Sequence, residues 1–121
     1  MTELVNANVM GRAAAGSMVA LEARAEHVAS RLAEVANARR LLILCHLAKK
    51  DAEGGGPGEA SVGELRSVVG LSQSALSQHL ARLRAAGMVA TRREGQTIHY
   101  RLADDETRAI MRALYATFCA A

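Results

Sequence analysis

Apolar residues recur at three- and four-residue steps over residues 18–36, the spacing of one apolar stripe along a helix. The stripe consists of Leu21, Ala25, Val28, Leu32 and Val35. A second helix is predicted over about residues 38–50, around the continuous apolar block at 41–44 that suits burial on more than one side. The glycine-rich run at 54–58 predicts a loop rather than a domain boundary, because neither flank is long enough to bury a core alone.

Capping signals predict two further helices joined by a short turn. Ser61 is followed three residues later by Glu64, the capping-box pattern, so a helix should begin near Ser61. Gly70 ends this helix, and Ser72 is the expected N-cap of the next one. Gly87 stands where the C-terminal cap of that helix belongs. Two helices joined by a turn with glycine form a helix-turn-helix.

The period then changes from helical to alternating. Residues 89–93 and 97–102 are interpreted as two segments with a period of two, and the Glu-Gly-Gln turn at 94–96 separates them, so a β-hairpin is predicted. After Asp104 the helical period returns in a row formed by Ile110, Leu114 and Phe118. We therefore expect a mainly α fold with a β-hairpin wing (α+β), a winged helix-turn-helix in the order α-α-α-α-β-β-α.

Composition narrows the function classes. The chain has 121 residues, half of them apolar, with a net charge of +3 and only 2% aromatic residues. So few aromatics argue against proteins that bind single strands by stacking bases. They also imply a small core of Leu, Val, Ile and Ala, which would gain from a partner subunit.

The first residues resemble neither a secretory signal nor a membrane span. We expect a flexible tail over residues 1–17, a DNA-binding and dimerisation domain over 18–121, no membrane association and a cytoplasmic location. Thiols are normally reduced there, so Cys45 and Cys119 are expected to be free or redox-active.

The fourth predicted helix carries a polar face that suits DNA. With its apolar residues turned inward, it presents outward Gln73, Ser74, Ser77, Gln78 and Arg82. These amide, hydroxyl and guanidinium groups are the types that read base edges in a major groove. His79 lies beside this face and is expected at a phosphate. On one helix alone, a merely solvated face would be the better interpretation.

The following segment favours DNA binding. Residues 80–101 contain five arginines and one acid, a net charge of +4, which exceeds that of the whole chain. The wing residues expected to contact double-stranded DNA are Arg92, Arg93, Gln96 and His99.

The segment 61–102 resembles the ArsR/SmtB family of bacterial repressors. The similarity is carried by LSQSALSQHLARLRAAGMV at 71–89 and TRREGQTIHYRL at 91–102. The resemblance implies a homodimer, joined through its first and last helices, that binds an imperfect palindrome and releases it on sensing an inducer. The apolar stripes on both terminal helices agree with this interface, although an ordinary intramolecular core would also need them.

Metal sensing, one mode of the family, finds little support in the sequence. Sensors resembling this fold carry cysteines in the third helix, or acids paired with histidines on the last helix. Residues 61–69 contain neither Cys nor His, and no histidine follows His99. The four histidines lack metal-ligand spacing, so we predict no metal site and no cofactor. His46, beside Cys45, is the one histidine worth testing.

The cysteines resemble the dithiol branch of the family. They lie 74 positions apart, so any bond between them is tertiary, and the plain alternative is two small buried apolar residues. The similarity rests on RLLILC at 40–45 and YATFC at 115–119. It implies a switch in which Cys45 and Cys119 become linked in response to persulfides, polysulfides or oxidants. The glycine-rich insertion after Lys50 departs from this branch without touching either motif.

Two alternatives stay open from the sequence. One keeps the DNA-binding module but gives it a metal or another ligand as inducer. The other is a thiol enzyme, which the residues disfavour because the chain has no Cys-x-x-Cys motif and no phosphate-binding loop after a strand. We therefore expect no enzymatic activity.

Overall fold

The computed structural model describes residues 7–54, 56 and 58–119, with side chains from Met18 onward. The chain divides into two compact units, residues 1–32 and 33–121, and each is described by itself. The first unit contains most of helix α1 (Ala7–Val35). This helix begins eleven residues before the predicted start at Met18, so residues 7–17 of the expected tail have helical backbone. Residues 1–6 of that tail lie outside the described residues.

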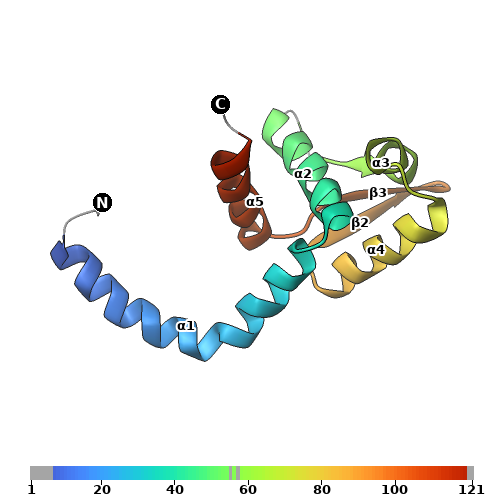
Figure 1. Cartoon of the computed structure of the whole chain (residues 1–121). Coiled ribbons are helices and arrows are strands. Elements are labelled where there is room, and N and C mark those ends of the chain that lie inside the picture. Colours follow the sequence, from blue (N-terminus) through green and yellow to red (C-terminus); the bar gives the residue numbers. More distant parts are fainter. Residues whose placement is uncertain (1–6, 55, 57, 120–121) are drawn as a thin grey trace. The chain divides into compact units, whose positions relative to one another are not determined.

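The second unit contains the other helices of the described chain, as Figure 1 shows: α2 (Ala38–Glu53), α3 (Val62–Val69), α4 (Gln73–Ala85) and α5 (Asp105–Phe118). Each begins at a residue whose side-chain oxygen accepts a hydrogen bond from a backbone N–H of the first turn, a donor that the helix leaves unpaired. The four caps are Asn37, Ser61, Ser72 and Asp104.

The predicted helix-turn-helix is confirmed in α3 and α4. Gly70 ends α3 with a φ of 66°, in the left-handed region that favours glycine. Gly87 follows α4 with a φ of 75°, and the Met88 N–H donates to the Leu83 carbonyl over 3.0 Å. These two turns fix where α4 starts and where the chain leaves it for the wing.

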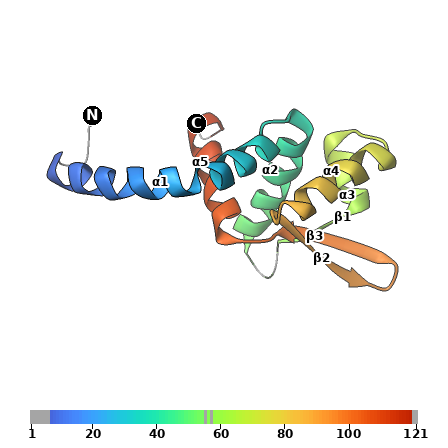
Figure 2. The ribbon, with the colours of Figure 1, turned by 90° about the horizontal axis from the view of Figure 1, so that it is seen from below.

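The predicted hairpin consists of β2 (Val89–Glu94) and β3 (Thr97–Leu102), and Figure 2 shows it projecting beyond the helices of the second unit. A third strand, β1 (Ala60–Ser61), was not predicted, because two residues are too short to show an alternating pattern. It pairs antiparallel with β3, and Ser61 lies opposite His99. The sheet order is β1-β3-β2.

The core of the second unit is aliphatic, as its composition suggested. Ile43 and Leu44 of the apolar block are fully buried, whereas Leu42 is 42% exposed and faces away from the core. Packed with them are residues from the other helices: Leu65, Val69, Leu76, Leu80, Leu83 and Met111. Among the described residues, no helix combines the length and the apolar character needed to cross a membrane.

Candidate nucleic-acid interface and cysteine groove

Helix α4 presents the polar face that its sequence predicted. Leu76, Leu80 and Leu83 are buried in the core and orient the helix. The opposite side exposes five of the predicted contact residues: Gln73, Ser74, Ser77, Gln78 and Arg82. Because α4 is the second helix of a helix-turn-helix, this exposed row has the position of a recognition surface.

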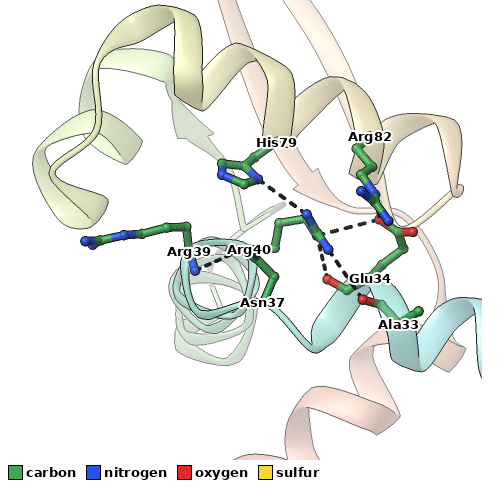
Figure 3. A network of polar contacts seen from close by, with 7 residues as sticks. All are labelled: Ala33, Glu34, Asn37, Arg39, Arg40, His79 and Arg82. Carbon is green, nitrogen blue, oxygen red and sulfur yellow. Dashed lines mark hydrogen bonds and ion pairs between the residues drawn. The ribbon is translucent and has the colours of Figure 1, made fainter.

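His79 lies at the edge of that row and is half-buried. Its Nδ1 is 3.5 Å from Nη1 of Arg40, which comes from the first turn of α2 (Figure 3). A guanidinium only donates hydrogen bonds, so His79 Nδ1 is the acceptor and its ring proton is assigned to Nε2. The structure thus gives His79 an intramolecular partner that the sequence did not indicate.

The predicted wing residues divide between the two faces of the hairpin. Arg92 lies opposite His99, and Arg93 lies opposite Ile98, so the two arginines point to opposite sides. Arg93 and Gln96 are exposed, and His99 is half-buried with its Nε2 3.5 Å from Oε1 of Glu94. The positive charges of Arg92 and Arg93, which are adjacent in the sequence, therefore lie on opposite faces of the hairpin.

Glu59 is a charged partner of the wing that sequence reasoning missed. Arg92 donates to both carboxylate oxygens of Glu59 over 2.8–3.1 Å. This hydrogen bond from Arg92 lowers the pKa of Glu59, with smaller contributions from the nearby positive charges. The two residues are 33 positions apart in the sequence, and the pairing of β1 with β3 brings them together. No local sequence pattern could therefore have predicted this contact.

Glu34 is a second missed acid. Near the end of α1, its Oε1 accepts a hydrogen bond of 2.7 Å from Nε of Arg82 on α4 (Figure 3). The same oxygen is 3.6 Å from Nε of Arg40. The Glu34 side chain is 12% exposed, so this carboxylate is largely withdrawn from water. Among the described residues, Arg82 and Arg92 of the basic segment thus each form an ion pair with a carboxylate.

The two cysteines line one groove between α2 and α5. Its volume is about 810 Å³, and its walls include Cys45, His46 and Lys49 on α2, with Arg112 and Tyr115 on α5. Cys119, directly after α5, completes the wall. Both thiols are free, Cys45 half-buried and Cys119 exposed. The fold thus brings the two predicted switch residues to the same cavity.

The two thiols lie in different environments. Burial raises the pKa of Cys45 above its ordinary value of 9.0, and the negative charge of Cys119 raises it further. Since the thiolate is the reactive form, burial lowers the reactivity of Cys45 at neutral pH.

His46 is bound to an acid rather than poised beside Cys45. Its Nε2 lies 2.6 Å from Oε2 of Glu64, and Nζ of Lys50 lies 3.2 Å from the same oxygen. The hydrogen bond with His46 is the main reason that the pKa of Glu64 is lowered. Within residues 7–54, 56 and 58–119, no group of three or more His, Cys, Asp or Glu side chains is arranged to hold a metal ion.

Comparison with known proteins places these features in context. Residues 37–91 match the family model described as "Bacterial regulatory protein, arsR family". The chain is 46% identical over 101 residues to the biofilm growth-associated repressor of Agrobacterium fabrum, covering 84% of this chain and 80% of that protein. It is 49% identical over 90 residues to the transcriptional activator HlyU of Vibrio cholerae, covering 74% and 76%.

Solved structures are similar over most of their length. Reduced HlyU from Vibrio cholerae aligns with a TM-score of 0.73 and 44% identity, over 83% of this chain and 97% of that chain. The homodimeric winged helix-turn-helix DNA-binding domain of Mb0332 from Mycobacterium bovis, a possible ArsR-family transcriptional regulator, aligns with a TM-score of 0.66 and 25% identity. That alignment covers 97% of this chain and 89% of the other.

Proposed function

Because the chain belongs to the arsR family of bacterial regulatory proteins, we propose that it is a homodimeric transcriptional repressor released from its operator when Cys45 and Cys119 become linked. Winged-helix regulators of this family bind DNA and are homodimers, and they are not enzymes. The relatives include a named repressor and a named activator, so repression is part of the proposal. The proposal also includes a cytoplasmic location, since a DNA-binding regulator must share a compartment with its operator.

The observation that carries the switch is the shared groove of the two cysteines. Two thiols 74 positions apart in sequence face one cavity and interact electrostatically. A direct disulfide requires Cα atoms within about 7 Å, and additional sulfur atoms bridge a wider gap with less strain. A similar protein, HlyU from Vibrio cholerae, has a solved structure that is described as reduced.

Exposure and pKa assign an order to the two cysteines. The exposed Cys119 thiolate attacks the outer sulfur of a hydropersulfide R–S–SH, giving Cys119–S–SH and releasing R–S⁻. The Cys45 thiolate then attacks the inner sulfur, closes a disulfide and expels HS⁻. If both cysteines carry a persulfide, the same attack leaves a trisulfide and again expels HS⁻. Peroxide reaches the disulfide through a sulfenic acid and releases water.

Linkage affects DNA binding through α2. The bridge would tie the end of α5 to α2, and α2 packs against both α3 and α4. A two-fold dimer must present its two recognition helices about one DNA turn (~34 Å) apart. A change in the packing of α2 shifts α4 relative to its partner copy and lowers the affinity for a palindrome.

Exposed apolar side chains on the terminal helices support the homodimer. Tyr115 and Phe118 on α5 are 61% and 78% exposed. On α1, large apolar side chains are also exposed, among them Met18, Val19, Leu21 and Leu32. A second copy of the chain is the occupant that the proposal assigns to these surfaces.

The test is a DNA-release assay combined with intact mass under non-reducing conditions. After polysulfide treatment of the wild-type chain, we expect a Cys45–Cys119 cross-link with or without added sulfur, and DNA affinity reduced at least about tenfold. Cys45→Ser and Cys119→Ser should each abolish the cross-link and the release. Release with both thiols unmodified would refute the switch, and release by stoichiometric zinc in the doubly substituted chain would favour a metal inducer.

A further inference from the structure

A buried ion pair stands at the junction of α1 and α2 (Figure 3). Arg40 donates from Nε to the Glu34 carbonyl over 2.7 Å and from Nη2 to the Ala33 carbonyl over 3.4 Å. The Arg40 side chain is only 7% exposed. These bonds pair Arg40 with the last carbonyls of α1 without requiring the side chain of Glu34.

The closest partner of the Glu34 carboxylate is instead Arg82. Its distance to Nε of Arg82 is 2.7 Å, compared with 3.6 Å to Nε of Arg40. Arg82 is 58% exposed, so it reaches from the surface of α4 to a carboxylate that is withdrawn from water. Such a contact fixes a long side chain that would otherwise sample many rotamers.

The geometry of this bond leaves Arg82 free to bind something else. A guanidinium has five N–H groups, and Glu34 takes the one on Nε. Among the described residues, the Arg82 side chain makes no further hydrogen bond, so the four N–H groups of its terminal nitrogens are available to a phosphate. Arg82 lies one helical turn beyond Gln78 on the exposed row of α4.

A carboxylate beside a DNA-binding surface repels the phosphate backbone and lowers affinity for every sequence. Any contribution of the Glu34 carboxylate to DNA recognition must therefore come from orienting the side chain that it binds. Phosphate contacts fix the register in which base contacts are made, so an arginine held at one angle improves discrimination between sequences.

We propose that Glu34 is a positioning residue for DNA recognition, holding Arg82 so that its terminal nitrogens bind one backbone phosphate and set the register of α4. The inference rests on the DNA-binding part of the proposed function and is independent of the cysteine switch. Arg40 holds the segment that carries Glu34 and also bonds to His79, so the α1–α2 junction supports α4 at two points.

The experiment compares two duplexes with the reduced full-length chain. One is the sequence that the wild type recovers from a random-sequence duplex library, and the other is a shuffled duplex of equal length. For Glu34→Gln, we expect affinity for the selected duplex to fall about tenfold, while affinity for the shuffled duplex stays equal or rises. A purely structural role of Glu34 would lower both affinities together.

Two further variants make the result decisive. Arg82→Lys keeps the positive charge but replaces the three guanidinium nitrogens with a single one, so it cannot bind Glu34 and a phosphate through separate nitrogens. We expect this variant to lose discrimination between the two duplexes to the same extent as Glu34→Gln. Adding Glu34→Gln to it should change the affinities little more. Glu59→Gln is the matched control, because it also removes a carboxylate from an arginine pair, and it should raise both affinities equally.

Thermal unfolding identifies variants that fail to fold. Unchanged discrimination in Glu34→Gln, or in Arg82→Lys if the first variant does not fold, would overturn the inference. If the wild type recovers no sequence from the library, DNA recognition itself fails, which is a different outcome.

Discussion

Arg92 on the wing is neutralised by Glu59, which precedes β1 and lies 33 residues earlier in the chain. Their contact consists of three hydrogen bonds between the guanidinium and the two carboxylate oxygens. Arg93, on the opposite face of the hairpin, has no ion pair among the described residues. Two adjacent arginines therefore differ in the net charge that they bring to a DNA backbone.

This difference predicts unequal roles in DNA binding. Arg93→Ala should weaken binding to all sequences and reduce the slope of log K against log salt by about 0.9, the value for one phosphate contact. The double variant Arg92→Ala with Glu59→Gln removes a neutral pair, and it should change the slope by less than about 0.3. Salt titrations of fluorescence anisotropy measure both. Equal slope changes would contradict the assignment of Arg93 as the free wing cation.

Gln78 on the exposed row of α4 is predicted to read a base. Gln78→Ala should weaken binding to the selected operator by about 1–3 kcal/mol, because a bidentate amide contact is lost. Binding to a shuffled duplex should hardly change. Thr117→Ala, an exposed substitution on α5, serves as the control. A loss of equal size on both duplexes would argue that Gln78 does not discriminate between bases.

The two cysteines should react at different rates. Cys119 is exposed, and burial raises the pKa of Cys45, so iodoacetamide at pH 7.5 should label Cys119 about tenfold faster. Raising the pH should accelerate Cys45, since more of its thiol then ionises. Peptide mass spectrometry measures both rates, and in denaturant they should converge. Faster labelling of Cys45 in the folded chain would reverse the proposed order of attack.

The contact of Glu64 with His46 and Lys50 should make stability dependent on acid. The folded-state pKa of Glu64 lies below its ordinary value of 4.5, so the folded chain binds this proton less tightly than the unfolded chain. Its stabilising effect is complete above pH 4.5 and is lost as pH falls through the folded-state pKa. Because the Glu64 side chain is 36% exposed, solvent screening limits the effect to about 1 kcal/mol or less.

Glu64→Gln should therefore lower the thermal stability at pH 7 and make little difference well below pH 4. Melting curves of wild type and variant across this range measure the effect. Glu53→Gln, the same change at an exposed position of α2, should leave the pH profile unaltered. A constant difference between Glu64→Gln and wild type at every pH would indicate lost packing rather than a lost charge.

The sequence by itself determined the local features. Helix caps such as Ser61 and Ser72 satisfy backbone donors within three residues, and Gly70 ends a helix through its own φ. The same holds for the polar row of α4, because a helical period places it opposite the buried leucines. The sequence did not predict strand β1, because it has only two residues and is defined by its pairing with β3.

Only the tertiary structure decided which charged and reactive groups meet. Glu34 and Arg82 are 48 residues apart, Glu59 and Arg92 are 33 apart, and the cysteines of the groove are 74 apart. Whether residues so far apart in the sequence meet in space depends on the path of the whole backbone. A sequence pattern, in contrast, shows only which residues are neighbours within a helical turn or along a strand. The sequence therefore determined which side chains could bind DNA or react, and the fold decided which of them are restrained by a partner.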